Sequence, residues 1–195
     1  MLRLKKNLSV LRKPSLLRTM AIMAFFLMLV QVNRVGGGVL ASELSDGYNL
    51  SPTMIGLVIG SMFFAAAVVQ VPVGLMLDSF GARRTLVGLS VIAVSGMILI
   101  GFASGAAELI IGRILVGIGH GASITGVYLL AVVWTSPERV STVAAITIAV
   151  GGALGGILGT APLAISFETL GFSDTFVLLA IASLFSSFLI WKLID

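Results

Sequence analysis

The sequence contains no cysteine, which excludes disulfide bonds, thiol catalysis and cysteine-bound metals and leaves the redox state of its compartment open. Charge is also scarce: 10% of the 195 residues are charged, against roughly 25% in soluble domains. In contrast, 58% of the residues are hydrophobic and the mean hydropathy is +1.15. These values exclude a water-soluble protein with a single core and indicate a helical membrane protein.

Positive charge is concentrated at the start of the chain. Residues 1–18 contain six basic residues and no acid, whereas the whole chain carries a net charge of +4. We interpret this segment as a basic cytoplasmic tail that helps to set the topology and can contact anionic lipid. The rest of the sequence has no basic face with interleaved aromatic residues, so we expect no nucleic-acid partner. The basic residues of the tail are Arg3, Lys5, Lys6, Arg12, Lys13 and Arg18.

Long apolar runs account for most of the remaining sequence. A membrane-spanning helix needs about 20 mostly apolar residues, and six windows meet this requirement. The first run is too long for the apolar region of a signal peptide, which has about 7–15 residues. We therefore predict an all-α membrane protein in which a six-helix transmembrane domain, 19–195, follows the tail. The predicted helices cover about 17–41, 52–77, 84–103, 107–134, 140–166 and 172–193.

The charges between the predicted helices alternate along the chain. Basic residues follow the second and fourth helices and stand at the end of the sixth, whereas the loops after the first, third and fifth contain acids and neither Lys nor Arg. By the positive-inside rule, both termini are expected to be cytoplasmic, in a multi-pass protein of the cell (inner or plasma) membrane. The basic residues are Arg83, Arg84, Arg139 and Lys192, and the acids of the other loops are Glu43, Asp46, Glu108, Glu168 and Asp174.

Two arginines lie inside predicted spans, Arg34 and Arg113. An arginine near the centre of a membrane helix costs about 2.5–3.5 kcal/mol on insertion scales, so it normally faces the protein interior or a wet cavity. Arg34 lies beside Gln31 and Asn33 and just before the three glycines at 36–38, a poor surface to present to lipid. We therefore expect Arg34 to face a cavity, while snorkelling or bonding to nearby carbonyls remain alternatives for both arginines.

The segment between the second and third predicted helices carries the most specific motif. It fits G-x-x-x-D-[RK]-x-G-x-[RK]-[RK] at all specified positions but Ser79 and resembles the signature loop of the major facilitator superfamily of secondary transporters. A glycine at the first position allows close helix approach, and the second glycine permits a tight turn. The resemblance implies that this loop is part of a cytoplasmic gate. The matching residues are Gly74, Asp78, Gly81, Arg83 and Arg84.

Two further segments resemble the same superfamily. Leu109, Arg113, Gly117 and Gly119 fit L-x-x-x-R-x-x-Q-G-x-G, with Val116 in place of the usual glutamine. The resemblance implies a role for the arginine in proton coupling or helix packing, and the lack of an acid away from the ends of the predicted spans argues against proton coupling.

Before the fifth predicted helix, Glu138 stands where the family often has an acid that pairs with the signature loop. The resemblance therefore implies an ion pair between Glu138 and Arg83 or Arg84. Because such a pair lies at the surface, we expect it to contribute little to stability.

Glycines and prolines recur in a pattern that predicts two related halves. The fifth predicted helix carries five glycines at close-packing spacings, and the family's antiporter-specific glycine–proline motif is not matched in full. An arginine followed by clustered glycines occurs in the first and fourth helices, and the second and fifth each have an early and a late proline. This favours a 3+3 inverted repeat. The residues are Gly151, Gly152, Gly155, Gly156, Gly159, Pro52, Pro72, Pro137 and Pro162.

An intramembrane serine protease is the main enzyme alternative. Ser123 follows a Gly-Ala pair, but His120 precedes it by three residues on the same predicted helix, and Ile124 replaces the glycine that such proteases have after the serine. We therefore expect no enzyme activity and no cofactor. One histidine is too few ligands for a metal site. His120 stands seven positions from Arg113, which predicts a similar helix face and a role in lining a cavity or in packing.

The resemblance covers about residues 20–192 and implies the N-terminal six-helix half of a superfamily transporter. The first hypothesis is therefore a secondary transporter, or half of one, that moves a small solute by alternating access. We expect an organic anion bound by Arg34, Gln31, His120 and Arg113, because the predicted cavity wall carries basic groups and no carboxylate. The second hypothesis is a membrane interaction subunit that does not transport, or a truncated half that needs a second six-helix partner or a copy of itself.

Overall fold

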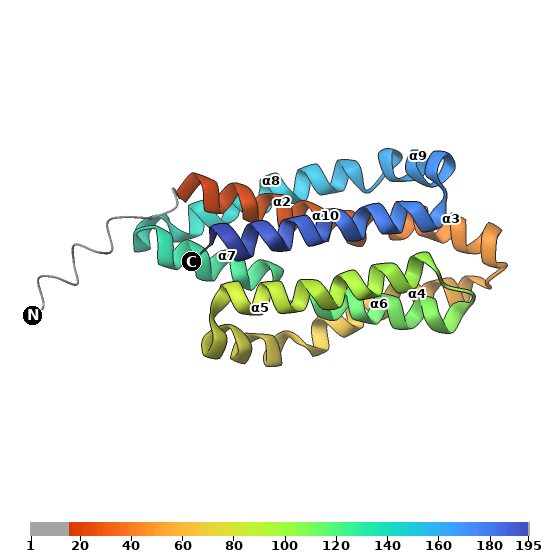
Figure 1. Cartoon of the computed structure of the whole chain (residues 1–195), viewed down its shortest axis with the longest axis horizontal. Helices are drawn as coiled ribbons and strands as arrows, with labels where there is room; N and C mark the ends of the chain where they lie inside the picture. Colours follow the sequence, from red (N-terminus) through yellow and green to blue (C-terminus); the bar gives the residue numbers. More distant parts are fainter. Residues whose placement is uncertain (1–15, 195) are drawn as a thin grey trace, which may run out of the picture.

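The computed structural model describes residues 16–194, and the elements in this part of the chain are helices. They run side by side along the long axis of the molecule (Figure 1). The predicted basic tail falls outside the described residues except for its last three positions, which begin α2. The helices are α2 (Leu16–Val35), α3 (Gly37–Tyr48), α4 (Pro52–Val68), α5 (Gln70–Gly101), α6 (Ala106–His120), α7 (Ser123–Trp134), the 3₁₀ helix η1 (Pro137–Arg139), α8 (Val140–Leu158), α9 (Ala161–Leu170) and α10 (Phe172–Leu193).

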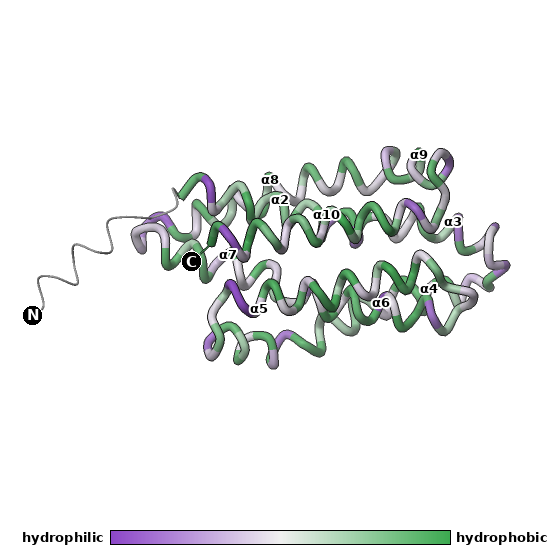
Figure 2. Tube along the Cα trace, in the orientation of Figure 1, coloured by the Kyte–Doolittle hydropathy of each residue, from purple (hydrophilic) through white to green (hydrophobic). Residues whose placement is uncertain are grey.

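Five stretches of the described chain are long and apolar enough to cross a membrane, which agrees with the prediction of a helical membrane protein. They are Leu16–Val35, Gln70–Gly101, Ala106–Trp134, Pro137–Leu158 and Phe172–Leu193. The helix Pro52–Val68 is apolar but shorter. Hydrophobic residues occupy the middle of the molecule and hydrophilic residues its two ends (Figure 2).

The signature loop contains a reversal of the chain within α5. Gly81 has φ 79° and ψ 165°, a conformation almost restricted to glycine, and the chain turns back at this point (Figure 1). The Thr85 hydroxyl donates to the carbonyl of Met76 across the turn at 3.0 Å. Gly171 has nearly the same conformation, φ 89° and ψ 167°, immediately before α10.

Four of the predicted spans are interrupted, a feature that the sequence analysis did not predict. The α4–α5 break lies at Val69, just before Pro72, and the α8–α9 break lies just before Pro162. A proline lacks the amide hydrogen that its helix needs and clashes with the preceding turn, which explains both breaks. The α2–α3 and α6–α7 breaks lie at glycines, Gly36 and Gly121.

Helix α3 continues to Tyr48, so much of the predicted loop at 43–51 is helical. The difference arises because polar residues end a membrane span without ending a helix. Asn49, with φ 51°, then closes α3 by donating its backbone N–H to the Leu44 carbonyl.

The breaks lie against one another in two pairs. A Cβ atom built on Gly36 would lie 3.7 Å from the carbonyl oxygen of Gly159, so the α2–α3 break adjoins the α8–α9 break. A Cβ atom on Gly121 would lie 2.7 Å from Cγ2 of Val69, so the α6–α7 break adjoins the α4–α5 break. Small residues thus allow the backbones to meet where the helices are interrupted.

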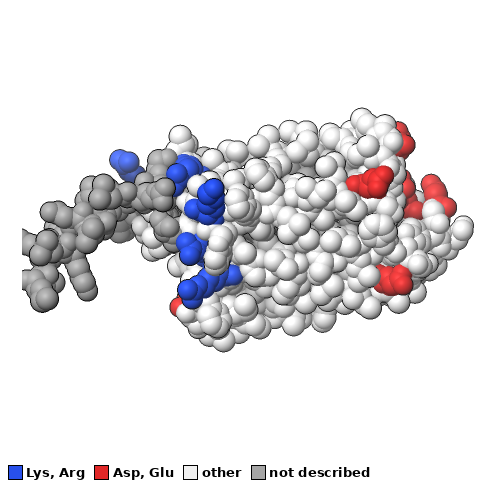
Figure 3. All heavy atoms as spheres, viewed as in Figure 1, with Lys and Arg blue, Asp and Glu red and all other residues white. Residues whose placement is uncertain are grey.

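Opposite charges occupy opposite ends of the molecule. The visible Lys and Arg side chains gather at the end where α2 begins and α10 finishes, and most of the visible Asp and Glu side chains lie at the other end (Figure 3). Arg18 and Arg83 both belong to the basic end, since they donate to the Leu193 and Ile194 carbonyls at 3.4 Å. The segments that the sequence analysis assigned to one side of a membrane therefore lie at one end of the structure.

We expect Gly155→Ala to destabilise the protein through the contact between α2 and α8. A Cβ atom at Gly155 would lie 2.3 Å from the backbone oxygen of Met28, which cannot move without displacing α2. Such overpacking costs about 1–3 kcal/mol. Gly156→Ala is the matched control, because nothing lies within 4 Å of a Cβ atom there. Thermal unfolding in one detergent compares the two variants, and equal midpoints would contradict this packing.

Candidate functional site

Gln31 and Arg34 line a small hollow enclosed by α2, α7 and α8. Its volume is about 40 Å³, enough for a few atoms of a ligand. The two side chains share a face because they stand three residues apart in the last turns of α2. On α8, Gly152 contributes space, since nothing lies within 4 Å of a Cβ atom built there. The lining residues are Leu27, Val30, Gln31, Arg34, Ser123, Ile124, Ile148 and Gly152.

Ser123 brings a third polar side chain to the hollow. Its side chain is buried, at 1% exposure, while Gln31 and Arg34 are half-buried. Among residues 16–194, none of the three side chains has a hydrogen-bond or ion-pair partner. No carboxylate lines the hollow, so the guanidinium of Arg34 is the charged group in it. Three polar groups are therefore available to a ligand in one place.

The sequence analysis considered Ser123 only as a nucleophile and did not predict it as a binding residue. Its position follows from the α6–α7 break, which makes Ser123 the first residue of α7. The glycines at 117, 119 and 121 were the sequence signal nearest to that break, and the sequence analysis assigned them to the family motif and to the internal repeat.

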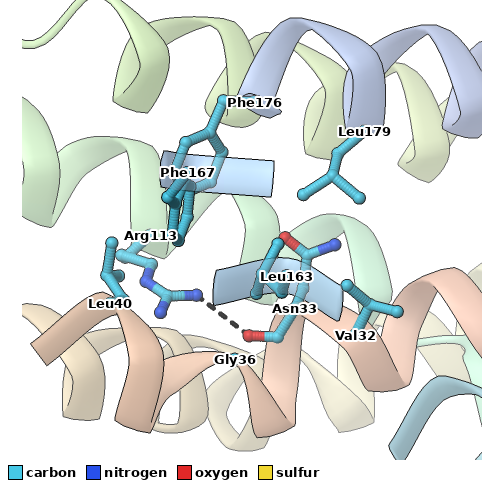
Figure 4. A pocket seen from close by; sticks show the side chains of 9 residues that line it. All are labelled: Val32, Asn33, Gly36, Leu40, Arg113, Leu163, Phe167, Phe176 and Leu179. Carbon is cyan, nitrogen blue, oxygen red and sulfur yellow. Dashed lines mark hydrogen bonds between the residues drawn. The ribbon is translucent and has the colours of Figure 1, made fainter. Parts of the chain in front are cut away.

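Arg113 lines a different cavity from Arg34. It is buried, at 2% exposure, and its Nη1 donates to the Asn33 carbonyl at 3.1 Å and to Sδ of Met62 at 3.4 Å. Figure 4 shows the guanidinium beside Asn33 and Leu40 in a cavity of about 10 Å³, the size of one water molecule. The structure therefore places Arg113 where it holds the last turn of α2 against α4 and α6.

His120 is buried at the end of α6 and does not line the hollow either. Its ring packs edge-on against Phe26, with 6.4 Å between the ring centres and an angle of 87°. In the described part of the chain, its Nδ1 atom has no hydrogen-bond partner. Arg113 and His120 thus share the buried side of α6, while Gln31 and Arg34 face the hollow.

The residues of the signature loop gather at the basic end of the molecule. Asp78 and Arg84 are exposed and Gly74 is half-buried. Arg83 is half-buried, donates to the Ile194 carbonyl and lies over the Trp191 ring, 4.8 Å from its centre. Arg83 therefore ties the signature loop to the end of α10.

Glu138 is exposed in η1. Its carboxylate accepts hydrogen bonds from its own backbone N–H and from the Ser136 hydroxyl. Within residues 16–194, no ion pair joins Glu138 to Arg83 or Arg84. The carboxylate is instead held by its own turn.

The sequence resembles known transporters. The profile of the Major Facilitator Superfamily matches residues 15–195. A probable sulfoacetate transporter of Cupriavidus necator is 29% identical over 104 residues, 53% of this chain and 24% of that protein. The sodium-dependent phosphate transport protein 1 of Mus musculus is 34% identical over 122 residues, 56% and 26% of the two chains. The arabinose-proton symporter of Bacillus subtilis is 35% identical over 88 residues, 44% and 19% of the two chains. The matches thus span about a quarter or less of these relatives.

Proposed function

Because the chain belongs to the Major Facilitator Superfamily, we propose that it moves a small organic anion across the cell membrane by alternating access, without covalent chemistry. It does so alone, as a homodimer or together with a second six-helix half. The observation that carries the proposal is the hollow in which Arg34, Gln31 and Ser123 have no partner among the described residues.

An anion is favoured over a neutral solute by the charge of this hollow. A guanidinium in low dielectric attracts anions and repels cations, and no lining carboxylate offsets it. Its charge is costly to keep within a membrane helix, so a counter-charge from the solute would offset part of that cost. Gln31 adds an amide that can donate to an oxygen of the same solute.

The names of the relatives divide between two solute classes. Two are named for anions, sulfoacetate and phosphate, and others are named for sugars, including arabinose and glucose. A sugar is therefore the second candidate. We favour the anion because a neutral sugar gives no counter-charge to Arg34.

Uptake into proteoliposomes tests the solute class. The chain, with whatever follows it in its reading frame, would be offered sulfoacetate, inorganic phosphate and L-arabinose. We expect saturable uptake of one of the anions and none of arabinose above empty vesicles. Uptake of arabinose alone would replace the anion by a sugar.

We further propose six transmembrane helices in a 3+3 inverted repeat. Support comes from matched spacings: Pro72 precedes Gly81 by nine residues, and Pro162 precedes Gly171 by nine. Both glycines have positive φ and each begins a helix that continues without a break. The segments α3 and α7, which follow the glycine breaks, have 12 residues each.

The paired breaks fit the same repeat. One pair joins the first and fifth predicted helices, and the other joins the second and fourth. An inverted repeat exchanges the first helix with the fourth and the second with the fifth, so it exchanges these two pairs. Interruptions related in this way would let the two ends of the bundle open in turn.

The proposed topology, with both termini cytoplasmic, can be tested by thiol labelling. The sequence has no cysteine, so a single introduced thiol gives the only signal. We expect Asn49→Cys to react with an impermeant reagent in intact cells, because it ends α3 at the acidic end. Ser79→Cys, in the signature loop, should react only after the cells are opened. Labelling in the reverse order would invert the topology.

A non-transporting interaction subunit is the alternative function. It is favoured by open glycines on α4 and α8: nothing lies within 4 Å of a Cβ atom at Gly56, Gly60 or Gly156. Such faces allow close packing against another helix bundle. A stable complex with a second membrane protein, and no uptake of any of the three solutes by that complex, would favour this reading.

A further inference from the structure

We propose that the first turn of α7, led by Ser123, holds the charged oxyanion group of the solute opposite Arg34. This inference rests on the proposed function and deepens it, because it names the part of the solute that is recognised. The group would be a carboxylate, sulfonate or phosphate whose oxygens accept hydrogen bonds from the Ser123 hydroxyl, the amides of this turn and the Arg34 guanidinium.

The break between α6 and α7 exposes a helix N-terminus inside the bundle. Hydrogen bonds near the break run from Gly121 N–H to the Ile118 carbonyl at 3.1 Å and from Gly126 N–H to the Ala122 carbonyl at 2.8 Å. The amides at 123–125 form the first turn of α7, where no carbonyl of the same helix lies one turn earlier. Such N–H groups and the positive end of a helix dipole favour an anion.

The Ser123 hydroxyl is the second, independent observation. It is buried, lines the hollow and has no hydrogen-bond partner among the described residues. The buried hydroxyls of Ser90, Thr147 and Ser187 donate to the carbonyl four residues earlier, at 2.7, 2.8 and 2.9 Å. Those of Thr19 and Ser186 also have no partner among the described residues, but they do not line the hollow. The hydroxyl of Ser123 both lines the hollow and is unused within its helix, so it is available to a ligand there.

The kinds of polar group in the hollow select the chemical class. A guanidinium and backbone N–H groups only donate hydrogen bonds, and a serine hydroxyl can donate as well as accept. An oxyanion accepts several such bonds, and its negative charge pairs with the guanidinium of Arg34, which has no carboxylate beside it in the hollow. A sugar hydroxyl also needs acceptors for its hydrogen, and the lining offers few beyond Gln31. The hollow therefore fits an oxyanion better than a polyol.

The positive potential that the proposal expects at the start of α7 can be measured without knowing the solute. Ile124→Cys places a thiol on the same turn, where the native side chain lines the hollow and is 42% exposed. Purified protein would be treated with anionic ethylsulfonate and cationic trimethylammonium methanethiosulfonates. For each variant we divide the rate of thiol modification by the anionic reagent by the rate with the cationic reagent. We expect this ratio to be about tenfold higher for Ile124→Cys than for Leu154→Cys, whose thiol stands at an exposed α8 position outside the hollow. Adding Arg34→Gln should reduce the ratio. Equal ratios at the two positions would overturn the proposal.

The hydrogen bonds that the proposal assigns to this turn can be tested by substitutions that each remove one donor. Ile124→Pro deletes an amide hydrogen in the first turn of α7, where proline is tolerated, and Gly38→Pro makes the same change in the first turn of α3. We expect Ile124→Pro and Ser123→Ala each to weaken sulfoacetate or phosphate binding about fivefold to tenfold, and Gly38→Pro to leave it unchanged. Ser123→Ala keeps the test valid if the proline variant does not fold.

The outcomes separate this inference from the proposed function. If sulfoacetate or phosphate binds the parent more tightly than Ser123→Ala but is not taken up, the oxyanion site stands and the proposed transport of that anion fails. If arabinose alone is taken up and neither anion binds, both proposals fail. If an anion is transported but Ser123→Ala and Ile124→Pro bind it as the parent does, the transport function stands and this assignment fails.

Discussion

Arg34→Gln is expected to weaken anion binding by about 1.5–3 kcal/mol, the scale of a hydrogen bond to a charged group. The glutamine keeps a donor in the hollow but removes the positive charge. Arg34→Lys should recover part of the loss, because an ammonium restores the charge without the planar set of donors. Titration of purified protein with the anion found by uptake measures the three dissociation constants.

Arg18→Gln is the matched control for this change. Arg18 lies on the same helix but at its other end, where it donates to the Leu193 carbonyl. It therefore tests whether loss of any positive charge on α2 weakens binding. A solute whose affinity is the same in the parent, Arg34→Gln and Arg34→Lys would show that Arg34 does not contact it.

The contacts of Arg113 indicate a different role from that of Arg34. Its guanidinium donates to the Asn33 carbonyl and lines a cavity with room for one water molecule rather than the hollow that Arg34 lines. Its contacts fix the turn of α2 that precedes Gly36 and carries Arg34. The positive charge of Arg113 thus supports the position of Arg34.

Five of the six predicted spans largely coincide with stretches long and apolar enough to cross a membrane, and the turn at Gly81 is also as predicted; the physical reasons are local. Apolar length alone identifies a membrane helix, and the α5 reversal falls at the one glycine whose spacing in the motif requires a turn. The alternation of basic and acidic loops likewise appears as two oppositely charged ends. Each of these features is determined by residues that are neighbours in the chain.

The interior of the bundle could not be predicted in the same way. The seven-residue spacing of Arg113 and His120 gives a shared face of α6, and the structure agrees, but it does not say which helix covers that face. Contacts from α2, through Asn33 and Phe26, cover both side chains, and neither lines the hollow that Arg34 lines. Ser123 could not be predicted as a lining residue because its position depends on the end of α6 at His120, and a break inside an apolar run does not change the hydropathy of the sequence.

The two arginines of the signature loop also differ in ways that the motif does not reveal. Arg83 is held by the Ile194 carbonyl and the Trp191 ring, whereas Arg84 is exposed beside it. The structure thus gives Arg83 a part in joining α5 to α10. A contact that changes between transport states is better assigned to the exposed groups, Arg84 and Asp78.

Gly81→Ala is expected to lower the rate of transport more than the amount of protein in the membrane. Nothing lies within 4 Å of a Cβ atom at Gly81, so the alanine meets no steric clash and acts only through backbone strain. At φ 79° and ψ 165° that strain is of order 1–3 kcal/mol. If about 1.4 kcal/mol of it enters the barrier between states, turnover falls about tenfold.

Gly88→Ala provides the control, because a Cβ atom there also meets nothing within 4 Å and its φ is not positive. Asp78→Asn tests the same turn by charge: the carboxylate lies three residues before Gly81, near the start of the returning helix, where an anion is favoured. Initial uptake rates, divided by surface abundance, compare the variants with the parent. The gate assignment requires Gly81→Ala and Asp78→Asn to be slow and Gly88→Ala to be normal. If all three match the parent at equal abundance, the turn serves only to connect two helices, and the change between states must depend on the paired breaks instead.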